Sequence, residues 1–351
     1  MSTDATHPHD RAVVIGIRRY ADVAAGWITN LEGPDNDAAA VAEWLRSPSG
    51  GGLPHDNVRL VCSADVPDPF PDDRVEPNQR GLMAALDEIA QLPKNAYGQY
   101  AGRRLYVYVS GHGWAWRHDH AAVVTAEARK ENRANVLVSS WLDWMRYSAP
   151  FEELVLWADT CASLTQLDFL QGCELAEKRS NNTNNVKLFS AFAAQLGLKA
   201  VENRMPDGSW HGAFTYALLE GLKGAATTPV TSDSLRNYLL NAMQGFMRDE
   251  QRADRTVARE PRFDRTDHME FGTPPRTTFP VTLRFPPECH GRPATVGRGK
   301  YVQPSDETVL QGIDWALRLE AGVHVAYVDQ RGFSQPFEVT GGATDAIAIA
   351  F

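Results

Sequence analysis

Cysteine is scarce in this sequence. The 351 residues include four cysteines at irregular spacing, which are Cys62, Cys161, Cys173 and Cys289. Domains held together by disulfides are typically short, secreted and dense in cysteine. The scarcity therefore argues against a disulfide framework, and we expect free thiols and a cytoplasmic protein.

Long apolar runs and an excess of positive charge are also missing. No stretch approaches the ~20 apolar residues that span a bilayer, and the N-terminus lacks the apolar core of a secretory signal. Asp and Glu number 44 against 35 Lys and Arg, which gives a net charge of −9. This charge argues against nucleic acid or an anionic membrane as a partner. No Gly-x-Gly-x-x-Gly or phosphate-loop pattern follows a predicted strand, so nucleotide binding is not expected.

The first 250 residues instead alternate short apolar runs with helical patterns. The runs end abruptly at small or polar residues, as buried strands of a parallel sheet do, and they cover residues 11–17, 57–62, 105–112, 154–161 and 186–190. Helices are expected at residues 35–45, 79–92, 139–145, 212–222 and 234–247. This alternation predicts an α/β fold with a doubly wound, mostly parallel sheet and right-handed crossovers.

The composition changes after Gln251. Residues 252–278 are rich in Arg, Asp and Pro, which predicts a linker or a segment that wraps the domain. Short strands without helical periodicity follow and predict a small β-sandwich; they cover residues 281–285, 316–328, 337–340 and 346–351. We therefore expect an α/β domain at residues 1–272 and a small all-β domain at residues 273–351.

Two reactive side chains follow two of the predicted strands. His112 lies between two glycines, and Cys161 comes 49 residues later, after Asp159 and Thr160. The carboxyl ends of strands in an open α/β sheet meet at one crevice, so we expect both side chains there. A thiol attacks as the thiolate and needs a base such as His, and a Cys with a His about 50 residues upstream is a recognised nucleophile pattern.

The same stretch supplies donors for an oxyanion. The backbone N–H groups of Gly113 and Cys161 would hold the oxygen of a tetrahedral intermediate. Taken singly, Cys161 and His112 are each compatible with a structural role, because free Cys is usually a small buried hydrophobe. The combination of both residues, their order and their spacing predicts catalysis.

In these features the chain resembles the caspase-like cysteine peptidases, nearer to metacaspases and bacterial caspase homologues than to animal caspases. The matching stretches are residues 12–17 with Tyr20, 31–38, 108–113, 159–163 and 211–222. The resemblance implies a three-layer caspase-like fold and peptide hydrolysis with His112 as base and Cys161 as nucleophile, without an essential third member. Two departures blur the subfamily: residues 162–164 replace the usual Ser-Gly after the Cys, and Pro34 stands where metacaspases often carry Cys.

The resemblance also implies a substrate pocket. Animal caspases bind a substrate Asp with Arg side chains, whereas the corresponding residues 32–37 here are acidic. By resemblance to metacaspases, Asp37, Ser110 and Asp159 line the S1 pocket, where two carboxylates would hold a substrate Arg or Lys. The alternative is that Asp37 only caps its helix and Asp159 only orders its loop.

Other candidates have plainer explanations. Trp114 and Trp116 would either wall the substrate groove or pack a loop. His118 and His120 form a weak metal pattern that fits a solvated loop better, because no further ligand set lies nearby. An acidic loop would bind Ca²⁺ as in many metacaspases, but it lacks the usual spacing and a solvated loop is preferred; its residues are Asp65, Asp68, Asp72 and Asp73. We therefore expect no metal and no cofactor.

Residues 173–185 suggest how the enzyme is controlled. This polar segment is expected to be exposed, as nicking sites are, and it contains Lys178 and Arg179, which an acidic S1 pocket would accept. Because the resembling family is processed in this connection, we expect a zymogen cleaved after one of these two residues; a loop that is never cut is the alternative.

The resemblance further implies protein substrates, an activating protease or effector, and a role in bacterial stress, regulated cell death or defence. The rival interpretation is a catalytically idle scaffold that binds partners through its C-terminal β-domain.

Overall fold

The structure is a computed structural model. It describes residues 6–63, 67, 70, 74–148, 150–164, 170–172, 180–205, 208–226, 228–274, 278–297, 304–320, 322–329, 333–339 and 346–349. Within these residues, no helix combines the length and the apolar character needed to cross a bilayer.

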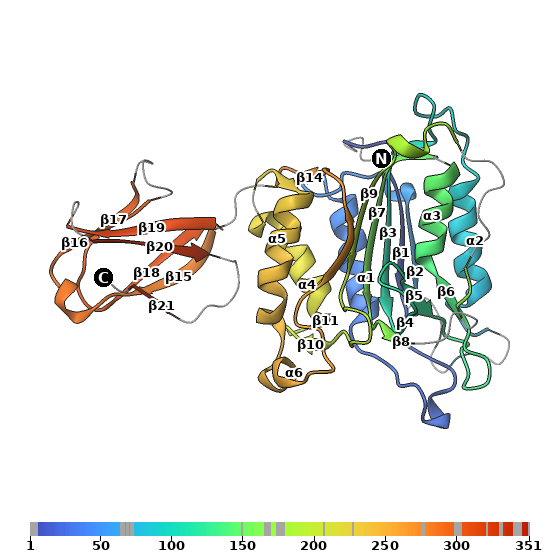
Figure 1. Ribbon diagram of the computed structural model, residues 1–351, viewed down its shortest axis with the longest axis horizontal. Coiled ribbons are helices and arrows are strands. Elements are labelled where there is room, and N and C mark those ends of the chain that lie inside the picture. Colours follow the sequence, from blue (N-terminus) through green and yellow to red (C-terminus); the bar gives the residue numbers. More distant parts are fainter. Residues whose placement is uncertain are drawn as a thin grey trace.

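A six-stranded sheet forms the centre of the molecule (Figure 1). Its strands are β1 (Arg11–Gly16), β2 (Val58–Cys62), β3 (Gly102–Gly111), β7 (Phe151–Thr160), β9 (Lys187–Phe192) and β13 (Arg262–Thr266). The order is β13-β9-β7-β3-β1-β2, and the pairs among β2, β1, β3, β7 and β9 are all parallel. The predicted parallel sheet is thus confirmed, with each of the five predicted strands at its place.

The sixth strand corrects the prediction for residues 252–278. This segment contains the short helix α6 (Asp249–Ala253) at its start and then β13, which pairs antiparallel with β9 at the sheet edge. Charged residues are common on edge strands because they oppose further pairing, and they hid the strand in the sequence. The Arg262 guanidinium of β13 stacks on the Phe192 ring, 3.9 Å from its centre.

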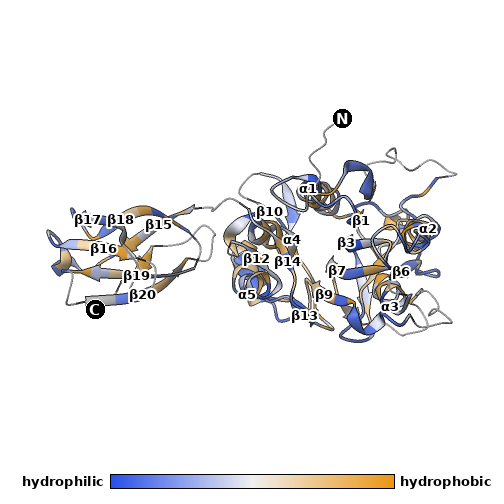
Figure 2. Ribbon diagram, turned by 90° about the horizontal axis from the view of Figure 1, so that it is seen from above, coloured by the Kyte–Doolittle hydropathy of each residue, from blue (hydrophilic) through white to orange (hydrophobic). Residues whose placement is uncertain are grey.

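Helices cover both faces of the sheet (Figures 1 and 2). The helices α1 (Pro34–Arg46), α4 (Ala213–Glu220) and α5 (Ser232–Ala242) lie on one face, and α2 (Gln79–Ala90) and α3 (Val138–Ser148) lie on the other. Helix α1 shows why: Ala38, Val41 and Leu45 recur on one face and are fully buried. Full burial of a Leu side chain stabilises the fold by about 1.5–3 kcal/mol. Helix α3 is longer than the predicted 139–145.

Shorter strands complete this part of the chain. A four-stranded sheet in the order β6-β5-β4-β8 follows the ends of β3 and β7. Its members are β4 (Gly113–Ala115), β5 (Ala122–Val124), β6 (Asn135–Leu137) and β8 (Ser163–Leu164). Two further pairs are β10 (Glu202–Arg204) with β11 (Trp210–Gly212), and β12 (Val230–Thr231) with β14 (Glu270–Gly272). The apolar run at residues 121–124 predicts a short strand, which β5 confirms, whereas the other strands are too short to show a period.

The C-terminal region is rich in β-structure, as predicted, and forms its own apolar core. Its strands are β15 (Thr278–Arg284), β16 (Pro293–Gly297), β17 (Pro304–Val309), β18 (Asp314–Glu320), β19 (Gly322–Val328), β20 (Phe333–Val339) and β21 (Ile347–Ala348). They form one sheet in the order β18-β15-β21 and another in the order β17-β16-β19-β20. The single strand predicted at 316–328 is two strands, β18 and β19, and β16 and β17 were not predicted.

Candidate active site

His112 and Cys161 stand at the ends of neighbouring strands. β3 and β7 pair in register, with Ser110 opposite Asp159 and Gly111 opposite Thr160. The next residue on each strand is therefore brought to the same edge of the sheet. After these residues the chains continue as β4 and β8, which pair in parallel.

The glycines around His112 have a packing role that the sequence did not reveal. A Cβ atom on Gly113 would lie 2.5 Å from the Thr160 Cβ, and one on Gly111 would lie 3.0 Å from the Tyr20 hydroxyl oxygen. Gly111 also has a φ of 152°, where side chains are disfavoured. A side chain at position 113 would collide with Thr160, and one at position 111 would strain the backbone next to His112.

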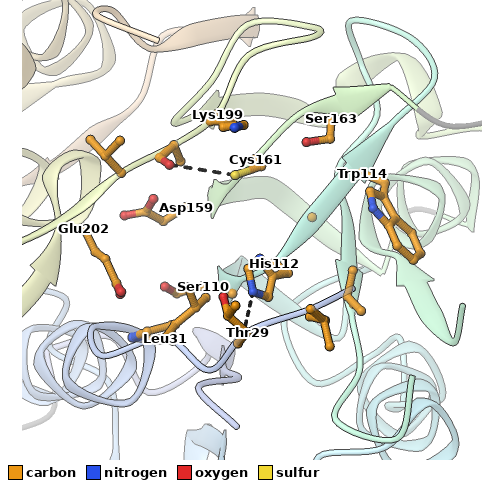
Figure 3. Close-up of a pocket in the computed structure, with 18 of the residues that line it drawn as sticks. Thr29, Leu31, Ser110, His112, Trp114, Asp159, Cys161, Ser163, Lys199 and Glu202 are labelled. Atoms are coloured by element: carbon orange, nitrogen blue, oxygen red, sulfur yellow. Dashed lines mark hydrogen bonds between the residues drawn. The ribbon is translucent and has the colours of Figure 1, made fainter. Parts of the chain in front are cut away.

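A cavity of about 630 Å³ opens at this edge, and both His112 and Cys161 line it. Figure 3 shows the two side chains facing each other across the cavity. All the residues predicted for the S1 pocket also line it; they are Asp37, Ser110 and Asp159. The structure therefore brings the predicted catalytic and S1 residues together in one place.

The imidazole of His112 is held by a backbone carbonyl. Its Nε2 lies 2.8 Å from the carbonyl oxygen of Thr29, to which it donates. The backbone N–H of His112 donates to the Tyr20 hydroxyl at 2.9 Å, and that hydroxyl donates to the carbonyl of Ile17. With the hydrogen on Nε2, Nδ1 is left as the acceptor. Burial lowers the pKa of His112, and the Thr29 carbonyl partly opposes this, so the ring is a neutral base at neutral pH.

The thiol of Cys161 points toward a different carbonyl. Its Sγ lies 3.8 Å from the oxygen of Ala200 and donates to it. Burial raises the pKa of Cys161; Asp159 raises it further, whereas the Ala200 contact and Lys199 lower it. The group therefore rests as a thiol and requires a base to become a nucleophile.

Asp37 is the most buried carboxylate of the cavity, with 1% of its surface exposed. It accepts hydrogen bonds from the Ser110 hydroxyl at 3.0 Å, from the Gly212 N–H at 3.1 Å and from Nδ1 of His211 at 2.8 Å. It lies within α1, whose N-cap residue is Gly33. Asp37 thus joins α1 to β3 and β11, which goes beyond capping its own helix.

Asp159 lies beside Asp37 with 6% of its surface exposed. Its Oδ2 accepts the N–H and the hydroxyl of Thr215 at 3.0 and 2.6 Å. A Cβ atom on Gly212 would lie 2.0 Å from the same oxygen, so glycine is required there. Burial, with the neighbouring Asp37 as a further cause, raises the pKa of Asp159 to about 7. Burial also raises the pKa of Asp37, although His211 opposes the rise.

Glu202 is a third carboxylate in the cavity, and the sequence did not reveal it. It lies in β10, and its two oxygens accept the backbone N–H groups of Glu32 and Gly33 at 2.8–3.1 Å. Burial raises the pKa of Glu202. In the sequence it is a lone acidic residue outside any motif, so only the folding of β10 against the start of α1 places it.

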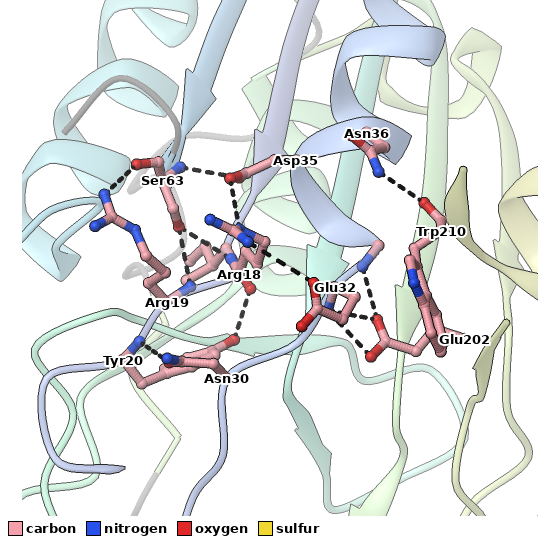
Figure 4. Close-up of polar contacts among 12 residues, drawn as sticks. Arg18, Arg19, Tyr20, Asn30, Glu32, Asp35, Asn36, Ser63, Glu202 and Trp210 are labelled. Atoms are coloured by element: carbon pink, nitrogen blue, oxygen red, sulfur yellow. Dashed lines mark hydrogen bonds and ion pairs between the residues drawn. The ribbon is translucent and has the colours of Figure 1, made fainter. Parts of the chain in front are cut away.

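A polar network holds the loop that carries Thr29 (Figure 4). The side-chain oxygen of Asn30 accepts the N–H of Tyr20 at 3.0 Å, and the N–H of Leu31 donates to the carbonyl of Arg18 at 2.9 Å. The Arg18 guanidinium lies 3.4 Å from the Asp35 carboxylate. The loop is thereby fixed between β1 and α1, which fixes the carbonyl that orients His112.

The remaining residues that the sequence singled out differ in their distance from the cavity and in their exposure. Trp114 lines the cavity, whereas Trp116 is 47% exposed and does not. His118 is exposed and His120 is buried, and no group of three potential metal ligands occurs among the described residues. The acidic loop residues Asp65, Asp68, Asp72 and Asp73, and the processing residues Lys178 and Arg179, lie outside the described residues.

Comparisons with known proteins agree with this architecture. Residues 9–266 match the family model described as the caspase domain. A probable protease from a Desulfuromonadales bacterium is 27% identical over 249 residues, which are 65% of this chain. The chain spans 28% of the length of that relative.

Solved structures are similar as well. Caspase-1 from Spodoptera frugiperda aligns with a TM-score of 0.50 at 12% identity, over 77% of this chain and 93% of that one. A protein from Geobacter sulfurreducens aligns with a TM-score of 0.42 at 14% identity, over 76% of this chain and 95% of that one. The likeness to the insect protein confirms the predicted caspase fold.

Proposed function

The chain belongs to the caspase family, and from this premise we propose that it is a cysteine endopeptidase that cleaves protein substrates after Arg or Lys. One observation carries the proposal. The cavity that contains His112 and Cys161 is also lined by three carboxylates, from Asp37, Asp159 and Glu202. The first pair supplies the chemistry of acyl transfer, and the carboxylates supply the preference for a basic side chain.

The reaction proceeds through an acyl-enzyme. Nδ1 of His112 takes the proton of the Cys161 thiol as Sγ forms a bond to the carbonyl carbon of the substrate. The oxyanion accepts hydrogen bonds from the N–H groups of Gly113 and Cys161. The imidazolium then gives its proton to the leaving amine as the C–N bond breaks. Water, deprotonated by His112, attacks the thioester, and the new acid leaves as the thiol is restored.

The carboxylates determine which side chain enters the S1 pocket. Asp37 is already saturated with hydrogen bonds, so it chiefly positions Ser110 and adds negative potential. Asp159 has one oxygen, Oδ1, without a contact to Thr215. A substrate guanidinium beside it would favour the ionised carboxylate, opposing the effect of burial. A substrate Asp would meet only like charge there, so cleavage after Asp is disfavoured.

Fluorogenic peptides that differ only in the P1 residue test this proposal. Wild-type protein should hydrolyse the Arg and Lys peptides and leave the Asp and Leu peptides intact, with Arg ahead of Lys because only guanidinium binds in a bidentate way. Cys161→Ala should be inactive on all of them. Preferred cleavage after Asp would refute the basic specificity, and a folded wild type that cleaves nothing even after processing at Lys178 or Arg179 would favour the idle scaffold.

The wider role follows the resemblance. We propose that the peptidase domain ends near residue 272 and that residues 273–351 form a separate domain that docks a partner; the separate apolar core of that region supports this division.

We also propose that the enzyme is a cytoplasmic zymogen activated by cleavage after Lys178 or Arg179, and that it acts in bacterial stress, cell death or defence. Mass spectrometry of wild type beside Cys161→Ala tests the processing, since self-cleavage fragments should appear only in the wild type.

A further inference from the structure

The two ends of the cavity differ in charge. The carboxylates lie at one end, and Arg133 and Trp114 also line the cavity. Figure 3 places Trp114 on the opposite side of the Cys161–His112 pair from Asp159 and Glu202. The Arg133 Cζ lies 5.9 Å from the centre of the Trp114 ring, within the range of a cation–π contact. The guanidinium therefore belongs to the end away from the carboxylates.

The small sheet holds these two residues in place. Trp114 lies in β4, two residues after His112, and Arg133 lies two residues before β6 begins at Asn135. Both β4 and β6 pair with β5, so the cation and the ring share one framework. Arg133 is nevertheless exposed and lines the cavity, so a ligand within the cavity can reach its side chain.

The chemistry of the reaction indicates which part of the substrate lies at the Trp114 end of the cavity. In the proposed mechanism the broken bond lies between Cys161 and His112, which donates a proton to the leaving amine, and the P1 side chain lies at the carboxylate end, beside Asp159. The chain after the broken bond leads away from the P1 pocket, toward the other end of the cavity. The residues that follow the broken bond thus pass Trp114 and Arg133.

We propose that Arg133, supported by Trp114, forms a subsite for an acidic side chain within the first three residues after the cleaved bond. This inference rests on the proposed function. The planar guanidinium presents a fork of donors that matches a carboxylate. A substrate with a basic P1 residue followed by Asp or Glu would match both ends of the cavity. Lys199 is a second cation of the lining and lies near Cys161 and Ser163 in Figure 3, so the test must separate it from Arg133.

Internally quenched peptides measure the preference directly. All carry the same residues up to an Arg at P1, and each of the next three positions is varied in turn among Asp, Ala and Lys. For wild type, kcat/KM should be about 3–10-fold higher with Asp than with Ala at the best position, a size typical of a partly exposed ion pair. This Asp/Ala ratio should fall to about 1 in Arg133→Ala. In Arg133→Glu it should fall below 1, and Lys should become the preferred residue.

A matched control and a competing variant make the test specific. Arg129→Glu makes the same charge change on the same loop, but Arg129 is exposed and is not among the residues that line the cavity; it should keep the wild-type ratio. A wild-type ratio near 1, or a ratio unchanged in Arg133→Glu, overturns the proposal. Inversion by Lys199→Glu with none in Arg133→Glu also overturns it.

An aminomethylcoumarin amide of Arg separates this inference from the proposed function. It has no residues after the scissile bond, so its hydrolysis by the wild type depends only on the peptidase activity and the S1 pocket. Hydrolysis without any preference for Asp in the longer peptides refutes the subsite alone. A wild type that has been processed after Lys178 or Arg179 and hydrolyses neither this amide nor the peptides refutes the proposed function, and the subsite with it.

Discussion

The two ends of the cavity are built in different ways. The acidic end rests on the central sheet, and its carboxylates of Asp37 and Asp159 are buried and hydrogen-bonded to fixed donors. The other end rests on the small sheet β6-β5-β4-β8, and its charge is the exposed guanidinium of Arg133 over a half-buried Trp114. A buried charge is screened little by solvent, whereas an exposed one is screened strongly.

Because of this difference, the two ends are expected to affect substrate specificity by different amounts. The desolvated carboxylates are expected to accept or reject a P1 residue by orders of magnitude, because an unpaired buried charge is costly. The exposed cation is expected to grade substrates by a few fold, because surface ion pairs contribute little. The catalytic pair lies between the two ends and serves both. Changes at these three places should therefore differ in size in a definite order.

The largest effect should come from the pair that both ends depend on. Cys161→Ala and His112→Ala should each lower kcat/KM for an Arg peptide by about 10⁴-fold or more, because the first removes the nucleophile and the second removes the base that activates it. The double variant should lose little beyond either single one, as expected of groups that act as a unit. Circular dichroism checks that each variant keeps its fold. Turnover by Cys161→Ala close to that of the wild type would exclude the proposed nucleophile.

The next effect should come from the acidic end. Asp159→Asn should lower kcat/KM for an Arg peptide by roughly 10²–10⁴-fold, because it removes the charged partner of a desolvated ion pair, which is worth about 3–5 kcal/mol. Asp56→Asn is the matched control, since Asp56 is fully exposed and lies away from the cavity. A loss as small as that at Arg133 would show that the two ends are not different in kind.

The pH dependence of kcat/KM tests the acidic end in a second way, because kcat/KM should change by about tenfold per pH unit along its acid limb. Burial raises the pKa of Asp159 to about 7, so in the free enzyme this carboxyl gains a proton as the pH falls below 7 and loses its attraction for Arg. The acid limb of kcat/KM for an Arg peptide should therefore lie near pH 7. In Asp159→Asn the limb should move to lower pH, where His112, whose pKa burial lowers, is protonated. A limb that stays in place in this variant would assign it to another group.

Much of this site follows from local sequence patterns. His112 and Cys161 each follow an apolar run that ends abruptly, and the parallel register of β3 and β7 then brings them together. Glu202 and Arg133 carry no such signal. Their place depends on how a short hairpin and a small sheet fold back onto strand ends, which is a matter of tertiary packing. The edge strand β13 was missed for a different reason: its charged residues made residues 252–278 resemble a linker or a wrapping segment.

The last effect concerns the stability of the fold, for which the two ends should again differ. The pKa of Asp159 is raised from 3.8 to about 7 on folding, so this group's contribution to stability is present below pH 4 and is lost as the pH rises from 4 to 7. Asp159→Asn removes the buried charge, and at pH 8 it should raise the free energy of unfolding by about 1–3 kcal/mol, less than the full linkage because the amide pairs less well with Thr215. The gain should be smaller at pH 5.

Arg133→Ala, a substitution at an exposed position, should change the free energy of unfolding by no more than about 0.5 kcal/mol at either pH. Urea unfolding at the two pH values measures all four differences. If Asp159→Asn instead lowers the free energy of unfolding by the same amount at pH 8 and at pH 5, folding does not cost the Asp159 carboxylate its solvation. Its burial would then not explain the selectivity for a basic P1 residue.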